Sequence, residues 1–332
     1  MTARHMKRHL KAVLILLCVA LLAGGLFVAS FPLQWWNISV EDLRARYQRP
    51  ESQFLTIDGV EIHFQDQGNA QGKAVVLLHG NFGNLRTYDE WLHFLGDRYR
   101  LIRFDSPLSG LSAPDPSGDY SIERRIFLMR QLLEHLQLTE YFLVATSFNA
   151  PTAFRVAARE PHSVLGLVLG NAGGLPRTAA NNPNRPEKDR IRRWVQQYYF
   201  PRSFFERTLL RLLPDPERRG EEIIDQFHLM VTAKGRPREG AQILQQFDSQ
   251  DAQDYLEKIT VPVLLQWTTD GDQPLLVDQD LARYQAWLNN APLQTIEYAG
   301  VGHMLYQNAP DQTAVDAGRF MDELVASEFN GD

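Results

Sequence analysis

One serine stands between a strand-like run and a helix-like run. Residues 142–144 (FLV) are apolar and typical of a buried strand, and residues 150–154 (APTAF) are compatible with the start of a helix. Ser147 lies between the two runs. On a sharp strand-to-helix turn, a serine hydroxyl is held out of the sheet, and helix N-terminal amides beside it can stabilise a substrate oxyanion. Ser147 is therefore a candidate nucleophile, although an ordinary turn serine is the simpler interpretation of this stretch alone.

The residues around Ser147 fit such a turn in part. A tight turn requires small residues two positions before and two positions after the serine. Ala145 meets this requirement, whereas Asn149 meets it only partly; asparagine does tolerate unusual backbone angles better than most residues. Pro151 would lie in the first helical turn, where its missing amide hydrogen costs little.

Three further stretches could complete a catalytic site. His303 lies in a glycine-flanked loop (GVGH) after a strand-like run and is a candidate general base. Asp270 and Asp272 follow another such run, and either carboxylate could orient His303 and stabilise its charged form. The stretch HGNFG at 79–83 ends an earlier run, where the amide of Asn81 could donate to an oxyanion. The order serine, acid, histidine is that of one known triad class.

The candidates must be positioned by the elements that precede them. The stretches FLTID and VEIHFQDQG predict a hairpin that turns at Asp58-Gly59. Helical patterns separate most of the later apolar runs, which predicts a mainly parallel sheet with helices on both faces. Residues 174–257 contain only helix-like segments, so we expect them to form a lid over one end of the sheet. The later strands are predicted at 73–78, 101–104, 142–144, 164–169, 261–267 and 293–298.

Four stretches together resemble the α/β-hydrolase superfamily. They are HGNFGN at 79–84, RFDSPLSGLSAP at 103–114, the turn around Ser147, and YAGVGHMLYQNAP at 298–310. The resemblance covers roughly residues 53–327. It implies an α/β fold in which a mainly parallel eight-stranded sheet has helices on both faces and a helical cap between strands six and seven.

The resemblance also implies roles for individual residues. Ser147 would be the nucleophile and His303 the base, and the amides of Asn81 and Phe148 would form the oxyanion hole. The position at which the family commonly has its acid after strand seven is Gly271 here. Asp272 fits with one inserted residue and Asp270 with one deleted residue. We favour Asp272, because an apolar stretch then follows it as in the family. An acid after strand six is not expected, because Leu169-Gly170-Asn171 offers only asparagine.

Two departures from the family pattern add side-chain bulk near the expected site. Members usually carry G-x-S-x-G-G, and this chain has ATSFNA at 145–150. They usually carry D-x-P-G-x-G, and this chain has DSPLSG at 105–110. The changes could reshape the site around an unusual substrate or mark a member whose catalysis has decayed.

The serine favours one group of reactions. Related dehalogenases and epoxide hydrolases carry aspartate at the nucleophile position, so the serine favours acyl transfer to water instead. The expected substrate is a small, apolar acyl compound such as a carboxylic ester. The alternatives are a catalytically inactive binding protein tethered to the membrane, a C–C bond hydrolase, and an aminopeptidase related to the proline iminopeptidases. The aminopeptidase would need acidic groups in the lid, for which Glu187, Asp189 and Glu206 are candidates.

The N-terminus predicts a membrane anchor. Residues 1–11 are basic, and residues 12–31 form an uncharged run long enough to span a bilayer as a helix. The positive-inside rule then leaves the N-terminus in the cytoplasm and places the catalytic domain on the non-cytoplasmic side. A cleaved signal peptide is the alternative, with Val28-Ala29-Ser30 as its site, and would give a secreted protein. The single cysteine, Cys18, lies within this run.

The rest of the domain organisation follows from these segments. Residues 32–52 are a connector, 53–173 and 258–332 are the hydrolase core, and 174–257 are the helical cap. The early part of the cap alternates aromatic residues with arginines; this pattern indicates either a helical core face with a solvated basic face or a lid resting on anionic lipid. The aromatic residues are Trp194, Tyr198, Tyr199, Phe200, Phe204 and Phe205, and the arginines are Arg190, Arg192, Arg193, Arg202, Arg207 and Arg211.

Composition and motifs argue against other classes of ligand. The net charge is −6 although the first eleven residues are basic, and an acidic body is not a footprint for nucleic acid. The nine histidines show no metal-ligand spacing such as H-E-x-x-H, and no glycine-rich nucleotide loop is present in the sequence. We therefore expect neither a metal nor a cofactor.

Overall fold

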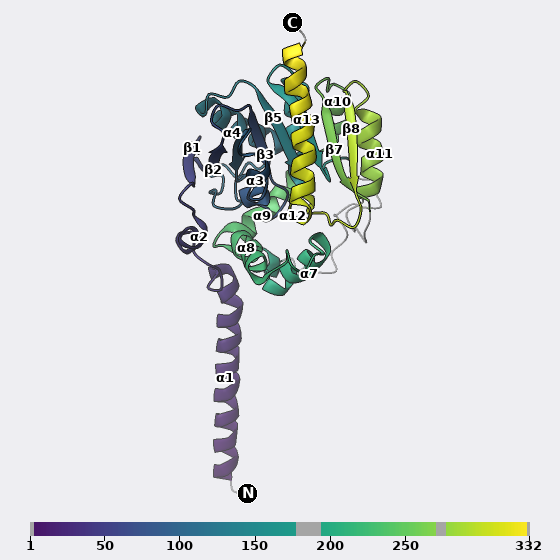
Figure 1. Ribbon diagram of the computed structural model, residues 1–332. Coiled ribbons are helices and arrows are strands. Elements are labelled where there is room, and N and C mark those ends of the chain that lie inside the picture. The colour runs from purple at the N-terminus through teal and green to yellow at the C-terminus, as the bar shows by residue number, and fades with distance from the viewer. Residues whose placement is uncertain (1–2, 177–193, 270–276, 331–332) are drawn as a thin grey trace.

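The computed structural model describes residues 3–176, 194–269 and 277–330, which form an α/β body with one projecting helix (Figure 1). The body is built on an eight-stranded sheet with the order β1-β2-β4-β3-β5-β6-β7-β8. The β1–β2 and β2–β4 pairs are antiparallel, and the other pairs are parallel. The predicted mainly parallel sheet is thus confirmed. The strands are β1 (Gln53–Ile57), β2 (Val60–Gly68), β3 (Ala74–Leu78), β4 (Arg100–Phe104), β5 (Tyr141–Thr146), β6 (Val164–Gly170), β7 (Val263–Thr268) and β8 (Leu293–Tyr298).

The hairpin predicted at Asp58-Gly59 is formed by β1 and β2. Both turn residues have positive φ, 48° for Asp58 and 83° for Gly59. A two-residue turn of this kind matches the right-handed twist of its strands, and Asp-Gly is a favoured sequence for it.

The central strands are buried on both faces, because helices cover each side of the sheet. Leu143 and Ala145 of β5 point to one hydrophobic core, and Phe142 and Val144 point to the other. This alternation follows from the two-residue period of a strand. It explains why the sequence of β5 is continuously apolar.

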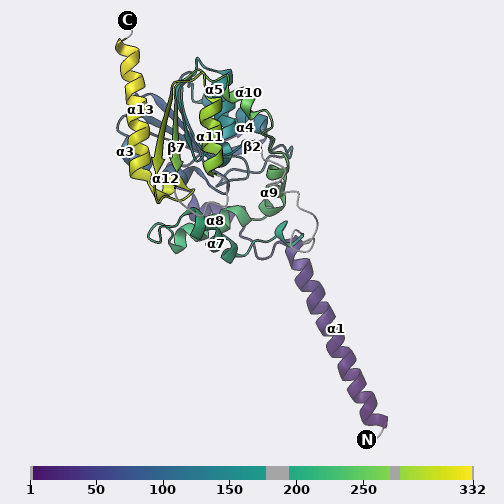
Figure 2. The same cartoon turned by 90° about the vertical axis from the view of Figure 1, so that its right-hand side faces the viewer.

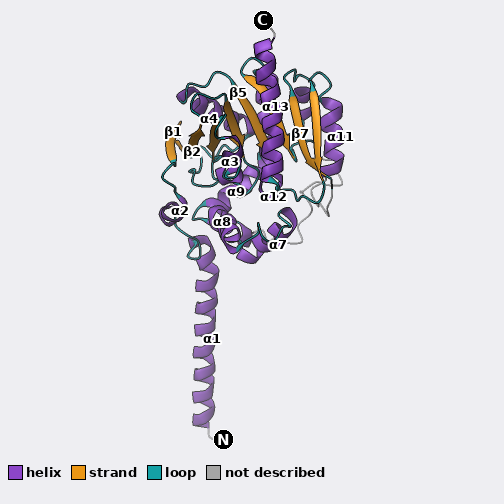
Figure 3. Ribbon diagram, viewed as in Figure 1, coloured by secondary structure: helices purple, strands orange, loops and turns teal. Residues whose placement is uncertain are grey.

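The helices form a layer on each face of the sheet, as Figures 2 and 3 show. Helix α4 begins after Ser121, whose side chain accepts a hydrogen bond from the amide of Arg124 and so caps the helix. One layer contains α4 (Ile122–His135), α5 (Ala150–Arg159), α10 (Ala252–Leu256) and α11 (Val277–Trp287). The other contains α3 (Trp91–Leu95), α12 (Leu305–Asn308) and α13 (Pro310–Asn330).

Three helices between β6 and β7 lie across one end of the sheet (Figure 2), and we call them the cap helices. They are α7 (Arg202–Leu212), α8 (Glu221–Thr232) and α9 (Arg236–Gln245). Phe205 and Leu209 of α7 pack against Ile224 and Phe227 of α8 in a separate hydrophobic cluster. The ring of Phe82, from the loop after β3, contacts Phe205 edge to face. The cap helices therefore touch the loop that carries Asn81.

Helix α1 (Ala3–Leu33) projects from the side of the body that carries the cap helices (Figures 1 and 2). Its segment Lys11–Leu33 is long and apolar enough to cross a membrane, and a signal sequence would share these properties. The ring of Phe31 contacts Trp194 and Tyr199. Beyond it, the side chain of Asn37 donates to the carbonyl of Tyr198 at 3.0 Å, and α2 (Val40–Tyr47) follows. The end of α1 is thus attached to the segment that leads into the cap helices.

Candidate active site

Ser147 occupies a sharp turn between β5 and α5. It begins a short 3-10 helix, Ser147–Asn149, and has φ of 50°. A residue other than glycine in this left-handed region is strained, and such strain is found most often at functional sites. A Cβ atom at Gly80 would lie 3.3 Å from Ser147 Cβ, and the amide of Gly173 donates to the carbonyl of Ser147 at 3.0 Å. Gly80, after β3, and Gly173, after β6, therefore lie directly against this turn.

His303 lies beside Ser147. The loop after β8 places its Nε2 atom 3.0 Å from Ser147 Oγ, within hydrogen-bond distance. The side chain is buried, and burial lowers the pKa of His303 to about 4. At neutral pH the imidazole is therefore neutral, which is the form that can accept a proton from serine. The buried Nδ1 atom makes no hydrogen bond to the described residues.

The two candidate acids lie outside the described residues. Strand β7 ends at Thr268, and the range 270–276, which includes Asp270 and Asp272, follows it.

Asn171 directly follows β6 and contacts both the end of β7 and the loop after β8. Its side chain donates to the carbonyl of His303 at 2.9 Å and accepts from the amide of Thr268 at 3.0 Å. Asn171 therefore positions the histidine loop.

The loop after β3 carries Asn81 to the same end of the sheet. His79 anchors this loop: its Nδ1 lies 2.8 Å from the carbonyl of Gly80, and its Nε2 accepts from the amide of Ser106 at 3.0 Å. Since Nε2 accepts, the proton must be on Nδ1. Burial lowers the pKa of His79, which favours this neutral form. Asn81 and Phe148, whose amides the sequence assigns to an oxyanion hole, line one cavity of ≈ 20 Å³.

Asn149, the unusual residue of the turn, is fully used in hydrogen bonds. Its Nδ2 donates to the carbonyl of His79 at 2.6 Å and to Ser106 Oγ at 3.1 Å, and its Oδ1 accepts from Arg125 Nη1 at 3.0 Å. Its φ is −93° and its ψ is 0°, a sparsely populated backbone conformation that does not require glycine. The positive φ belongs to Ser147 instead. Asn149 connects the serine turn to both neighbouring loops.

The second departure from the family pattern places a residue other than glycine at a position with positive φ. Leu108 stands where the family has glycine, and its φ is 68°. Gly110, which the chain retains, has φ of 49°. A Cβ atom at Gly110 would lie 2.0 Å from Asp105 Oδ2, so no larger residue fits there.

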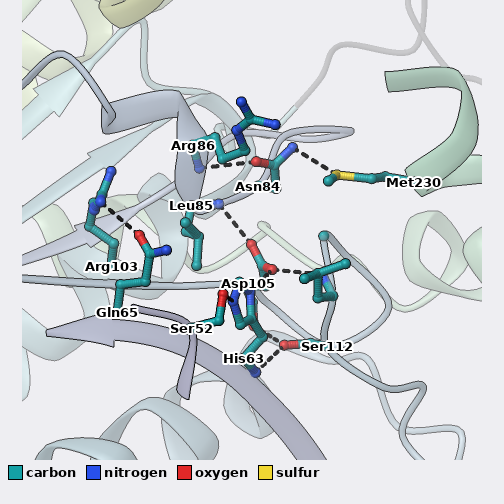
Figure 4. A network of polar contacts seen from close by, with 12 residues as sticks. Ser52, His63, Gln65, Asn84, Leu85, Arg86, Arg103, Asp105, Ser112 and Met230 are labelled. Atoms are coloured by element: carbon teal, nitrogen blue, oxygen red, sulfur yellow. Dashed lines mark hydrogen bonds and ion pairs between the residues drawn. The ribbon is translucent and has the colours of Figure 1, made fainter. Parts of the chain in front are cut away.

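Asp105 belongs to a second serine–histidine–aspartate arrangement, shown in Figure 4. His63 Nδ1 lies 2.7 Å from Asp105 Oδ2, and His63 Nε2 lies 2.8 Å from Ser52 Oγ. Asp105 also accepts hydrogen bonds from the amides of Leu85 and Leu111, both at 2.7 Å. Burial would raise the pKa of Asp105, but His63, His79 and the amide of Leu111 hold it below its usual value.

The surroundings of Ser52 argue against a catalytic role for this second arrangement. The cavity beside His63 and Asp105 measures ≈ 10 Å³, which is about the space of one water molecule. Ser52 Oγ accepts from the amide of Arg49 at 3.1 Å, in a turn before β1 rather than at a strand-to-helix junction. We interpret the group as a polar tie between β2 and the loop after β4.

Several of these residues were not identified from the sequence. Arg125 and Asn171 lie next to the site, and His63 supports a loop that borders it. The substituted turn residue Asn149 was one available signal, because a buried asparagine requires hydrogen-bond partners. Among the described residues, no group of three or more histidine, cysteine, aspartate or glutamate residues is arranged to hold a metal ion.

Comparison with known proteins decides the family. Residues 75–317 match the family model described as "Alpha/beta hydrolase family". This chain belongs to the α/β-hydrolase family. The fold and the enzyme class predicted from the sequence are thus confirmed. YugF of Bacillus subtilis, described as an uncharacterised hydrolase, is 24% identical over 77% of this chain and 93% of its own length.

Other relatives of this α/β-hydrolase differ in chemistry. A cis-3-alkyl-4-alkyloxetan-2-one decarboxylase of Shewanella oneidensis is 35% identical over 37% of this chain and 39% of that protein. An esterase from Thermogutta terrifontis has a TM-score of 0.68 at 20% identity, over 82% of this chain and 98% of its own. A bacterial membrane phospholipase A has a TM-score of 0.67 at 22% identity, over 96% of this chain and 99% of its own. These structural likenesses show the fold.

Proposed function

We propose that this α/β-hydrolase cleaves a carboxylic ester or a related acyl compound, with Ser147 as nucleophile and His303 as base. The observation that carries the proposal is the 3.0 Å contact between Ser147 Oγ and His303 Nε2 at a strained strand-to-helix turn. A serine hydroxyl becomes a useful nucleophile when such a base can take its proton. Ser147 directly precedes Phe148, which lines one cavity with Asn81.

The proposed reaction has two steps. Ser147 Oγ attacks the carbonyl carbon while His303 Nε2 takes its proton, and the amides of Asn81 and Phe148 stabilise the oxyanion. His303 then returns the proton to the leaving alcohol, which gives an acyl-enzyme. Water attacks this acyl group with His303 again as base. His303 then returns the proton to Ser147 Oγ as the acid is released.

An acid at His303 Nδ1 completes the proposal. That atom is buried, with no hydrogen bond to the described residues, so it needs an acceptor. Asp272 is our first candidate and Asp270 the alternative, because both follow β7 directly along the chain. The carboxylate would stabilise the imidazolium that forms as Ser147 attacks.

We extend the proposal to the membrane. Helix α1 would be a single-pass anchor with the body on the non-cytoplasmic side, as the basic N-terminus suggests. Trp35 and Trp36 at the end of α1 are exposed, as is common at a membrane interface. Because α1 leaves the body beside the cap helices, acyl substrates held at the membrane surface would lie near the site. The fold likeness to a membrane phospholipase A is consistent with this placement.

Acidic neighbours neutralise one arginine of the basic face proposed for the cap. Arg202 forms ion pairs with Glu206, Glu221 and Asp225 and so carries no free positive charge to a membrane. Arg190, Arg192 and Arg193 lie outside the described residues. Of the three acidic residues considered for binding a peptide amine, Glu206 alone is among the described residues, and it is paired with Arg202. This pairing disfavours an aminopeptidase.

A direct assay tests the proposed reaction. The full-length protein in detergent micelles should hydrolyse 4-nitrophenyl esters of short and medium acyl chains. Ser147→Ala and His303→Gln should each lower kcat by at least about 10³-fold. A folded wild-type protein that hydrolyses no ester in the series would favour the binding-protein alternative.

A further inference from the structure

Arg125 is a buried charge beside the proposed oxyanion hole. It lies in the first turn of α4, and its side chain is only 6% exposed. It lines the same cavity as Asn81, Phe148 and Asn149. The cation therefore contacts Phe148 directly and shares this cavity with Asn81.

Only one nitrogen of the Arg125 guanidinium is engaged. Its Nη1 donates to Asn149 Oδ1 at 3.0 Å and to the carbonyl of Phe148 at 3.4 Å. The Nε and Nη2 atoms are buried and have no hydrogen-bond partner among the described residues. Donors buried in this way are rare in folded proteins and call for a partner.

The charge of Arg125 is also unbalanced. Within the described ranges, no carboxylate forms an ion pair with it, and the charged group that acts on it is another cation, Arg155. Burial lowers the pKa of Arg125 to about 9, so the side chain is still protonated at neutral pH. Arg155 itself is paired with Asp251. A buried charge without a counter-ion is strongly unfavourable, so an anion at this position would stabilise the site.

A second buried arginine, Arg236, lacks a partner only at Nε among the described residues. Arg236 donates through Nη1 to the carbonyls of Gly110 and Met230, both at 2.7 Å, and through Nη2 to the carbonyl of Ser112 at 3.0 Å. Protein carbonyls thus occupy both of its terminal nitrogens. Arg125 differs because its Nη2 also has no partner among the described residues and because its side chain lines the cavity with Asn81 and Phe148.

The two buried atoms without a partner form one edge of the guanidinium. Nε and Nη2 point in the same direction and can donate two parallel hydrogen bonds to a carboxylate. The same edge of Arg100 binds Asp66 in this way, with Nε to Oδ1 at 2.9 Å and Nη2 to Oδ2 at 2.7 Å. The cavity of ≈ 20 Å³ has room for a group of only a few atoms. A planar carboxylate fits this edge and this space better than a phosphate.

We propose that Arg125 binds a carboxylate carried by the acyl part of the substrate. The inference rests on the proposed function, because it places the acyl group between the oxyanion hole and Arg125. The hydrolysed compound would then be the ester of a short dicarboxylic acid. The apolar character expected from the sequence would belong to the alcohol part, which would extend toward the aromatic cap cluster around Phe205.

The alternative is that Arg125 has only a structural role. Its guanidinium lies 4.4 Å from the centre of the Phe148 ring, which stacks on Phe247, and it also supports Asn149. Such a role would influence the turnover of all substrates alike. It would not distinguish a charged acyl group from a neutral one of the same shape.

Matched substrates separate the two roles. We would compare monomethyl succinate, glutarate and adipate with the corresponding carboxamide methyl esters, which are neutral and nearly isosteric, using full-length protein and methanol release. The wild type should prefer the carboxylate at one chain length by at least 10-fold in kcat/KM. Arg125→Gln should lower this ratio at least 10-fold. Arg236→Gln, which removes a buried arginine that does not line the cavity, should leave the ratio unchanged.

Three results would overturn the inference. The first is a wild-type preference for the carboxamide at every chain length, which needs no folded variant. The second is an Arg125→Gln variant that retains the full wild-type ratio. The third is a stronger preference for methyl 3-phosphonopropionate, which would assign the site to phosphate-like groups. A fluorophosphonate probe applied to each protein separates these from failure of the proposed function, since it reports the activated serine independently of acyl charge.

Discussion

The Nδ2 atom of Asn149 donates a hydrogen bond of 2.6 Å to the backbone carbonyl of His79. This contact joins the turn that carries Ser147 to the loop that carries Asn81. A glycine at position 149 could not make it. The residue that made the turn look defective in the sequence is therefore the one that connects the two halves of the proposed oxyanion hole.

Replacing Asn149 should damage both stability and activity. Asn149→Ala removes two donated hydrogen bonds and the shorter of the two acceptors of Arg125 Nη1, so we expect the free energy of unfolding to fall by about 1–3 kcal/mol. A small displacement of the oxyanion amides should lower kcat/KM by about 10- to 100-fold. Thermal unfolding and ester hydrolysis measure the two effects. An Asn149→Ala protein with wild-type kcat/KM would show that the contact has no part in catalysis.

The pH dependence of activity should identify the acid. Burial lowers the pKa of His303 to about 4, and a carboxylate near Nδ1 raises it by stabilising the imidazolium. The base acts in its neutral form, so kcat/KM falls as the pH falls through this pKa. Asp272→Asn should move the acidic limb to lower pH and reduce kcat by about 10³- to 10⁴-fold.

Asp270→Asn is the matched control for that experiment. It removes a carboxylate from the same segment after β7, so it should leave the acidic limb and the plateau close to wild type. If instead Asp270→Asn shifts the limb and Asp272→Asn does not, the two roles are exchanged. A profile that neither substitution moves would contradict an acid in this segment.

The second serine–histidine–aspartate group should prove structural. Ser52→Ala removes one partner of His63 Nε2, so we expect a loss of about 0.5–1.5 kcal/mol in stability and unchanged ester hydrolysis. Asp105→Ala leaves His63 and two buried amides without their acceptor and should destabilise the fold by about 3–5 kcal/mol. Urea unfolding compares the two. Loss of activity in a stable Ser52→Ala protein would give this serine a catalytic role.

The membrane orientation can be tested with introduced cysteines. The only native cysteine is Cys18, so Cys18→Ser gives a background without thiols. In that background, Ser327→Cys should react with a membrane-impermeant maleimide in intact cells, and Thr2→Cys should react only after lysis. The opposite pattern would place the body in the cytoplasm, and recovery of Ser327→Cys in the medium would indicate cleavage of the N-terminal segment.

The elements of the fold could be predicted because each has a strong local signal. Asp58-Gly59 specifies a two-residue turn, and the apolar runs before Ser147 and before His79 are long enough to be buried strands. Ser147 and His303 could be paired because both follow strands of a parallel sheet, whose carboxyl ends meet at one edge.

The polar network beneath the site could not be predicted in this way. Arg125 lies in an ordinary amphipathic helix, and its position next to Asn149 depends on how α4 and α5 pack against the sheet. The pairing of His63 with Asp105 likewise depends on the register of β2 and β4, in which Phe64 lies opposite Phe104. Such contacts join segments far apart in the chain, and no local pattern encodes them.

Labelling with a fluorophosphonate tests the central claim most directly, because the probe reacts with a serine only when a neighbouring base activates it. Full-length protein in detergent micelles should be labelled at Ser147, as peptide mass spectrometry would show. Labelling should disappear in Ser147→Ala, fall strongly in His303→Gln, and persist in Ser52→Ala. Absence of labelling in a folded wild-type protein, or labelling that survives Ser147→Ala, would contradict the account.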